Sequence, residues 1–204
     1  MLHTKTVEPH TLGLLERLMQ QPYLKGFNLV GGTALSLQIG HRKSIDLDLF
    51  TSEDFDTAAL KSLLDSDFEH FQAMLERNNT LITTIDGVKV DFIRFKYGFA
   101  YPLLLENNFR LANINDIAPM KLDAITGRGK KKDFFDLYFL LQLFTLPQLL
   151  TLYQAKYQHT TLFHVIKSMN YFEEAEAEAN PIVFDKKVTW AAVKKAIISE
   201  IRKL

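Results

Sequence analysis

The chain has 204 residues, 24 Lys and Arg against 24 Asp and Glu, and a formal net charge of zero. A large nucleic-acid-binding face needs an excess of Lys and Arg, so this balance leaves room only for a local basic patch. The absence of cysteine excludes disulfides, zinc–thiolate sites and thiol nucleophiles. The chain starts without a signal-peptide pattern and has no apolar run of the roughly 20 residues that span a bilayer, so we expect a cytoplasmic protein with no membrane partner.

The first hundred residues alternate short strand-like and helical runs. FNLV (27–30) is a short apolar run that stops at Gly31 and Gly32. TALSLQIG (33–40) favours a helix, and SIDLDLF (44–50) alternates polar and apolar residues as a strand does. The expected order is therefore strand, helix, strand.

A hairpin signal follows in the same half of the chain. LITTI (81–85) and VKVDFIRF (88–95) flank Asp86 and Gly87. Asp-Gly between alternating runs is among the strongest short-range hairpin signals, because both turn positions need positive φ. We predict two antiparallel strands joined by a two-residue turn.

After Pro102 the pattern becomes helical. Residues 116–128 favour a helix with Asp116 as its N-cap, and the strongly apolar segment 133–144 favours a central helix. Three further runs with apolar residues near helical spacing complete the chain: 146–157, 161–172 and 190–204.

This order of elements predicts an α+β fold with two lobes. Residues 1–101 form a lobe with a small mixed sheet and helices, and residues 102–204 form a helical lobe. A cleft that the helical lobe completes is the natural place for a site.

The Gly31-Gly32-Thr33 run suits a phosphate. Glycine lets the backbone turn sharply and approach a ligand, and the helix start presents unpaired N–H groups at the positive end of its dipole. The Thr33 hydroxyl is a further candidate for the same phosphate. On its own, however, Gly-Gly-Thr is more often a plain strand-to-helix turn.

Asp46 and Asp48 are two residues apart in a strand-like run, so their carboxylates project from the same face. Ile45, Leu47 and Leu49 then face the core. Adjacent carboxylates repel each other unless a cation lies between them, and an all-oxygen ligand set suits Mg²⁺ or Mn²⁺. A solvent-facing edge strand with two ordinary acids explains the pair equally well.

A third acid favours the metal interpretation. Asp91 shares its strand face with Lys89 and Ile93, which is unusual for a simply solvated acid. If its strand lies beside residues 44–50, Asp91 joins the other two acids around a metal pair. Asp91 is then also placed to act as general base.

Four blocks in this order resemble a known group of enzymes. The blocks are GGTAL (Gly31 to Leu35), HRKSIDLDLF (His41 to Phe50), VKVD (Val88 to Asp91) and the helical segment from Lys121 to Leu137. They resemble the DNA polymerase β-type nucleotidyltransferases and, more closely, the AbiEii-type abortive-infection nucleotidyltransferase toxins. The resemblance covers roughly residues 27–141 and implies a polymerase β-like N-terminal lobe.

The resemblance also implies site roles, residue by residue. It assigns Gly31, Gly32 and Thr33 to the nucleotide phosphates, with Arg42 or Ser44 assisting. It assigns Asp46, Asp48 and Asp91 to Mg²⁺, Lys121 to the nucleotide phosphates, and Asp136 to anchoring the site from the next helix.

Spacing in the helical block leaves a second explanation open. Lys121 and Arg128 are seven residues apart and share a helix face, as do Asp133 and Asp136, three apart. An interhelical salt bridge explains these four residues nearly as well as a substrate role, and both can hold at once. His41 is better explained as a structural hydrogen-bonding residue than as a base.

A basic turn is the best candidate for an acceptor or RNA patch. Its members are Arg128, Lys130, Lys131 and Lys132. A solvated turn between helices is the simpler explanation of the same charges.

Together these features predict an enzyme that moves a nucleoside monophosphate from an NTP to an acceptor hydroxyl. The acceptor is a tRNA or another RNA, a protein, or a small molecule. The resemblance implies the toxin of a toxin–antitoxin or phage-defence system, with a cognate antitoxin protein as partner. The alternative is a catalytically inactive nucleotide- or partner-binding module, against which the three acids argue.

Overall fold

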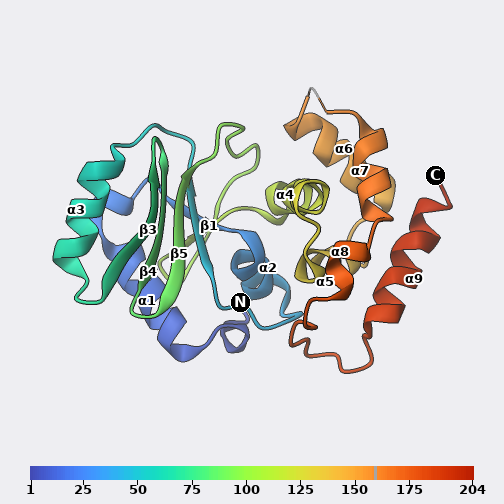
Figure 1. The fold of residues 1–204 in the computed structure, drawn as a ribbon, viewed down its shortest axis with the longest axis horizontal. Helices are drawn as coiled ribbons and strands as arrows, with labels where there is room; N and C mark the ends of the chain where they lie inside the picture. Colours follow the sequence, from blue (N-terminus) through green and yellow to red (C-terminus); the bar gives the residue numbers. More distant parts are fainter. Residues whose placement is uncertain (159) are drawn as a thin grey trace. The chain divides into compact units, whose positions relative to one another are not determined.

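The structure is a computed structural model that describes residues 1–158 and 160–204 (Figure 1). The described chain divides into two compact units. The first contains residues 1–40 and 44–113, and the second contains residues 41–43 and 114–204. No helix in the described ranges is long and apolar enough to cross a membrane.

A seven-stranded mixed sheet forms the centre of the first unit, in the order β3-β4-β5-β2-β1-β7-β6. Its strands are β1 (Asn28–Val30), β2 (Leu47–Thr51), β3 (Phe71–Arg77), β4 (Thr80–Ile85), β5 (Val88–Arg94), β6 (Leu104–Glu106) and β7 (Phe109–Leu111). The helices of this unit are η1 (Thr4–Thr6), α1 (Pro9–Gln20), η2 (Pro22–Leu24), α2 (Gly31–Ile39) and α3 (Thr57–Asp67). Helix α3 packs on β3 and β4, and α2 packs on β1 and β2 (Figure 1).

The predicted hairpin is confirmed. Strands β4 and β5 pair antiparallel through a turn in which Asp86 and Gly87 both have positive φ, 50° and 78°. On its other edge β5 pairs parallel with β2. Leu47 and Leu49 of β2 are buried, as the alternating pattern requires.

Two expectations about the first unit are corrected. Ile45 lies just before β2 and is 62% exposed, so it does not join the core, because the strand alternation starts only at Leu47. The segment after Pro102 does not become helical at once, since β6 and β7 follow it. Leu111 of β7 pairs with Leu29 of β1, so this short hairpin extends the sheet.

The second unit is helical. Its helices are α4 (Ile114–Gly127), α5 (Lys131–Leu140), α6 (Leu146–Lys156), α7 (Leu162–Met169), α8 (Glu173–Glu176) and α9 (Trp190–Ile201). Asp116 is not the N-cap of α4, because the helix starts two residues earlier. Asp116 is instead buried in the first turn, with a carboxylate oxygen 2.7 Å from Nζ of Lys156.

Candidate active site

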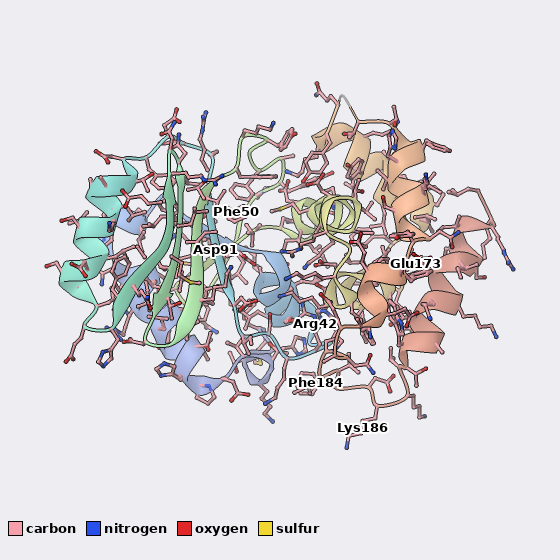
Figure 2. The ribbon with its side chains drawn as sticks, viewed as in Figure 1. Arg42, Phe50, Asp91, Glu173, Phe184 and Lys186 are labelled. Atoms are coloured by element: carbon pink, nitrogen blue, oxygen red, sulfur yellow. The ribbon has the colours of Figure 1, made fainter. Side chains whose placement is uncertain are left out.

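Asp48 and Asp91 form a carboxylate pair on the sheet of the first unit. They occupy paired positions of the parallel strands β2 and β5, and Figure 2 labels Asp91 there. Asp91 is only 8% exposed. Its Oδ2 accepts a hydrogen bond from Nζ of Lys89 at 2.5 Å, whereas its Oδ1 is buried without a hydrogen-bond partner in the described residues. A buried carboxylate oxygen without a donor is costly, so this atom suits a cation.

Gly31 makes room for one of these carboxylates. It opens α2 with a φ of +68°, and a Cβ built at this position meets Oδ2 of Asp48 at 2.2 Å. The Asp48 carboxylate therefore lies against the start of α2. The first N–H groups of a helix have no intrahelical acceptor and carry its positive dipole end, so this corner suits an anion bridged to a cation.

Thr33 and Ser44 hold the loop that carries Asp46. The Thr33 hydroxyl is buried and donates to the Asp46 carbonyl oxygen, and its Oγ1 lies 2.9 Å from Oγ of Ser44. The backbone N–H of Ser44 donates to the Thr6 carbonyl oxygen at 2.9 Å. These contacts join α2 to the segment before β2, so both hydroxyls serve a local structural purpose as well as any phosphate role.

Of the three predicted metal ligands, Asp48 and Asp91 lie at paired strand positions, whereas Asp46 lies outside the strand. Asp46 precedes β2 rather than lying in it, so strand alternation does not fix its direction. Among the described residues, no three His, Asp or Glu side chains lie close enough together to hold a metal ion. The carboxylate pair still fits a hard cation, because its donors are all oxygen and one of them is buried without a partner.

A buried ion cluster is the main polar feature of the second unit. The Asp136 carboxylate is fully buried and accepts from Nε and Nη2 of Arg42, at 2.6 and 2.9 Å. Nε2 of His41 lies 2.7 Å from the same carboxylate. Nζ of Lys121 lies 2.7 Å from Asp136 and 3.0 Å from the buried Asp133.

The opposite charges in this cluster keep each other ionised despite their burial. Burial raises the pKa of Asp136, but Arg42 and Lys121 outweigh it and hold the pKa well below its usual value. Burial lowers the pKa of Lys121, but Asp136 and Asp133 more than compensate, so its pKa is raised. Burial lowers the pKa of His41, whose neutral ring then donates from Nε2 to Asp136. The buried carboxylates of Asp133 and Asp136 are thus balanced by the buried cations Arg42 and Lys121.

This arrangement contains the interhelical salt bridge that spacing left open. Lys121 bonds Asp133, and Nε of Arg128 reaches the same carboxylate at 3.2 Å. Arg42 and Lys121 are 3% and 4% exposed, so both cations expected on phosphates are engaged by buried acids in this structure. His41 is the structural hydrogen-bonding residue that the sequence favoured.

The basic patch contains fewer surface residues than the four that were expected. Lys131 is buried, and its Nζ donates to the carbonyl oxygens of Glu176 and Glu178. Its backbone N–H donates to Oε2 of Glu178 at 2.7 Å, so an acidic segment covers the start of α5. The surface patch is therefore reduced to Arg128, Lys130 and Lys132.

Sequence reasoning missed the role of Lys89. Its ammonium is the only hydrogen-bond donor recorded for the Asp91 carboxylate within the described residues. The period of two along β5 was the available signal, because residues 89 and 91 share a strand face.

Comparison with known proteins decides the family. The sequence profile described as "Nucleotidyl transferase AbiEii toxin, Type IV TA system" matches residues 13–108 and 99–203. The chain belongs to this family. This AbiEii-family protein is therefore a nucleotidyltransferase, and the family is one of toxins from toxin–antitoxin systems.

The similarity to known proteins covers most of the chain. An uncharacterized protein of Aquifex aeolicus (strain VF5) is 35% identical over 175 residues, which cover 80% of this chain and 82% of the relative. The crystal structure of JHP933 from Helicobacter pylori is 15% identical and covers 97% of this chain and 92% of its own, with a TM-score of 0.57.

A second solved structure with this fold is MenT4, a nucleotidyltransferase toxin of Mycobacterium tuberculosis H37Rv. It is 15% identical and covers 87% of this chain and 76% of its own, with a TM-score of 0.56. At this identity the two structures show a shared fold, and they confirm the predicted α+β nucleotidyltransferase architecture.

Proposed function

We propose that this enzyme transfers a nucleoside monophosphate from an NTP to an acceptor hydroxyl in a Mg²⁺-dependent reaction and thereby acts as a toxin. The carboxylate pair of Asp48 and Asp91 beside the Gly31 corner is the observation that carries the proposal. The acceptor is an RNA such as tRNA, a protein or a small molecule. A cognate antitoxin is the expected protein partner, and the need for NTP agrees with action in the cytoplasm.

The metal is assigned to Asp48 and Asp91, with Asp46 as a third ligand. The buried Oδ1 of Asp91 supports this assignment, because a cation supplies the partner that it lacks. When bound, Mg²⁺ neutralises charge on the triphosphate and the leaving pyrophosphate, and Mn²⁺ is a suitable substitute.

The side chains and backbone of the first unit supply positioning and proton transfer. The N–H groups at the start of α2, from Gly31 to Thr33, bind the nucleotide phosphates. Asp91 accepts the proton of the acceptor hydroxyl while the hydroxyl oxygen forms a bond to the α-phosphorus. The bond from the α-phosphorus to the bridging oxygen breaks at the same centre, and pyrophosphate leaves.

In this proposal the ion cluster of the second unit positions the side chains of Arg42 and Lys121. Asp136 holds Arg42 and Lys121 through the contacts described above, and the assignment of Lys121 to the nucleotide phosphates follows from the family resemblance. The three remaining cations of the basic turn, Arg128, Lys130 and Lys132, are assigned to the acceptor.

A label-transfer assay tests the reaction. Purified protein is incubated with Mg²⁺, each α-³²P-labelled NTP in turn, and cellular RNA or protein. We expect label in a discrete band with wild type and with Asp65→Asn, an exposed acid on α3, and none with Asp48→Asn. Equal labelling by Asp48→Asn excludes the proposed site. Binding of NTP that does not change with Mg²⁺ supports the inactive-module alternative.

A further inference from the structure

A series of aromatic side chains starts beside the carboxylate pair. Phe50 follows Asp48 by two residues on β2, so it lies on the same sheet face and about 7 Å farther along the strand. Figure 2 labels Phe50 and Asp91 on the sheet of the first unit. Phe50 pairs in register with Ile93 of β5, which puts it at the end of the strand from which the next loop departs.

Three rings of that loop continue the series. The Phe50 and Phe95 ring centroids are 5.9 Å apart. Phe95 in turn contacts Tyr97 at 5.6 Å and Phe99 at 6.0 Å between centroids. We call Phe50, Phe95, Tyr97 and Phe99 the aromatic series.

The loop has a defined turn. The N–H of Gly98 donates to the Phe95 carbonyl oxygen at 3.0 Å, and Gly98 has a φ of +61°, which favours glycine. This turn brings Tyr97 and Phe99, on either side of the glycine, to the same ring of Phe95. The backbone turn therefore fixes the spacing of Tyr97 and Phe99 around Phe95.

Two tyrosines of this loop are exposed, unlike the structural aromatics in the same unit, while Phe50, Phe95 and Phe99 are half-buried. Phe27 and Phe92 also meet edge to face, but they are 4% and 0% exposed and belong to the core. Tyr97 is 47% exposed and the nearby Tyr101 is 38% exposed. Two exposed tyrosine rings that adjoin half-buried aromatics close to a reactive site suit a ligand that stacks on them.

A cation accompanies the exposed ring. Nζ of Lys96 lies 4.9 Å from the Tyr97 ring centroid. Aromatic faces next to a lysine are the combination that binds single-stranded nucleic acid, because bases stack on the rings while the ammonium pairs with phosphate. Stacking also suits a chain of zero net charge, since it does not depend on a wide basic surface.

We propose that the aromatic series, together with Lys96, binds unpaired bases of a nucleic-acid acceptor next to the hydroxyl presented to Asp48 and Asp91. This inference rests on the proposed transfer reaction and selects its acceptor class: an RNA with a single-stranded end, rather than a protein or a small molecule. Because every base has a stackable face, the series favours unpaired strands without reading their sequence.

Direct binding tests the inference without catalysis. Fluorescence anisotropy of a fluorescein-labelled ten-nucleotide single-stranded RNA is measured against the full chain, with the matching duplex as competitor. We expect wild type to prefer the single strand, and Tyr97→Ala to weaken binding about fivefold or more. Lys96→Ala weakens it less and reduces its salt dependence.

Matched variants control for general effects of ring removal. Tyr97→Phe keeps the ring and the affinity. Phe163→Ala removes a ring that is 70% exposed on α7 of the second unit, and it leaves the affinity unchanged. Unchanged affinity in Tyr97→Ala, or equal binding of duplex and single strand by wild type, overturns the inference.

The same variants separate this inference from the transfer reaction. Asp48→Asn is expected to keep or raise the affinity for the oligonucleotide while losing transfer. In turnover, Tyr97→Ala raises KM for the RNA acceptor about fivefold or more and leaves KM for NTP unchanged. Transfer to RNA with an unchanged acceptor KM contradicts the aromatic series alone, whereas RNA binding through Tyr97 without label transfer by wild type contradicts the proposed function alone.

Discussion

Asp48 and Asp91 are register partners on the parallel strands β2 and β5, so two acids leave the same face of the sheet side by side. One Asp91 oxygen bonds to Lys89 and the other is buried without a partner among the described residues. Like charges at neighbouring strand positions repel each other, so we expect the pair to reduce the stability of the fold.

Asp48→Asn is expected to abolish nucleotide transfer without destabilising the fold. The substitution keeps the shape of the side chain and removes the repulsion with Asp91, so the thermal midpoint stays the same or rises. Transfer assays and thermal unfolding of the same preparation measure both effects. A fall of several degrees in the midpoint identifies Asp48 as a structural residue instead.

Gly31→Ala tests the close approach at the start of α2. The added Cβ requires the Asp48 carboxylate to move, and the positive φ adds about 1–2 kcal/mol of backbone strain. Gly87→Ala is the matched control, because Gly87 also has a positive φ but its Cβ meets nothing within 4 Å. We expect similar losses of stability from backbone strain and loss of transfer only in Gly31→Ala. Equal activity of the two variants shows that the position of Asp48 does not matter.

Asp136→Asn is expected to destabilise the second unit by about 3–5 kcal/mol, because it leaves Arg42 and Lys121 buried without their shared carboxylate. Urea unfolding measures the change. Glu200→Gln is the control, since Glu200 pairs with the mostly exposed Lys203 and its loss has little effect. A change below about 1 kcal/mol in Asp136→Asn means that the cluster contributes little to folding.

Stability is expected to fall as the pH drops below about 6.5, the ordinary pKa of histidine. Burial lowers the pKa of His41 in the folded protein, so between the folded and unfolded pKa values the unfolded chain binds more protons. His41 therefore contributes stability that is present above the unfolded pKa and declines below it. The free energy of unfolding measured from pH 5 to pH 8 should lose part of this slope in His41→Gln. An identical slope in the variant excludes His41 as its source.

Local patterns predicted the elements that depend on neighbouring residues. The Asp86–Gly87 turn and the alternation of β2 follow from backbone preference and strand period, so the hairpin and the Asp48 face were accessible from sequence. Gly31 was predicted to approach a phosphate, which stays a prediction, whereas its close approach to Asp48 was not foreseen. The register that makes Asp91 the partner of Asp48 remained conditional, because it depends on which strands become neighbours.

Long-range contacts set the limit of such reasoning. Lys131 looks like a surface lysine, but its partner Glu178 is 47 residues away along the chain. Asp116 resembles an N-cap until Lys156 is brought to it by helix packing. The strands β6 and β7 are three residues each, too short to show a period.

Isotope position gives the most direct test of the central claim that the carboxylate pair supports nucleotidyl transfer. Wild type and Asp91→Asn are given RNA, Mg²⁺ and the same NTP labelled either at the α- or at the γ-phosphate. We predict that wild type incorporates the α-label and releases the γ-label as pyrophosphate. Asp91→Asn should do neither. Incorporation of the γ-label, or undiminished α-labelling by Asp91→Asn, contradicts the account.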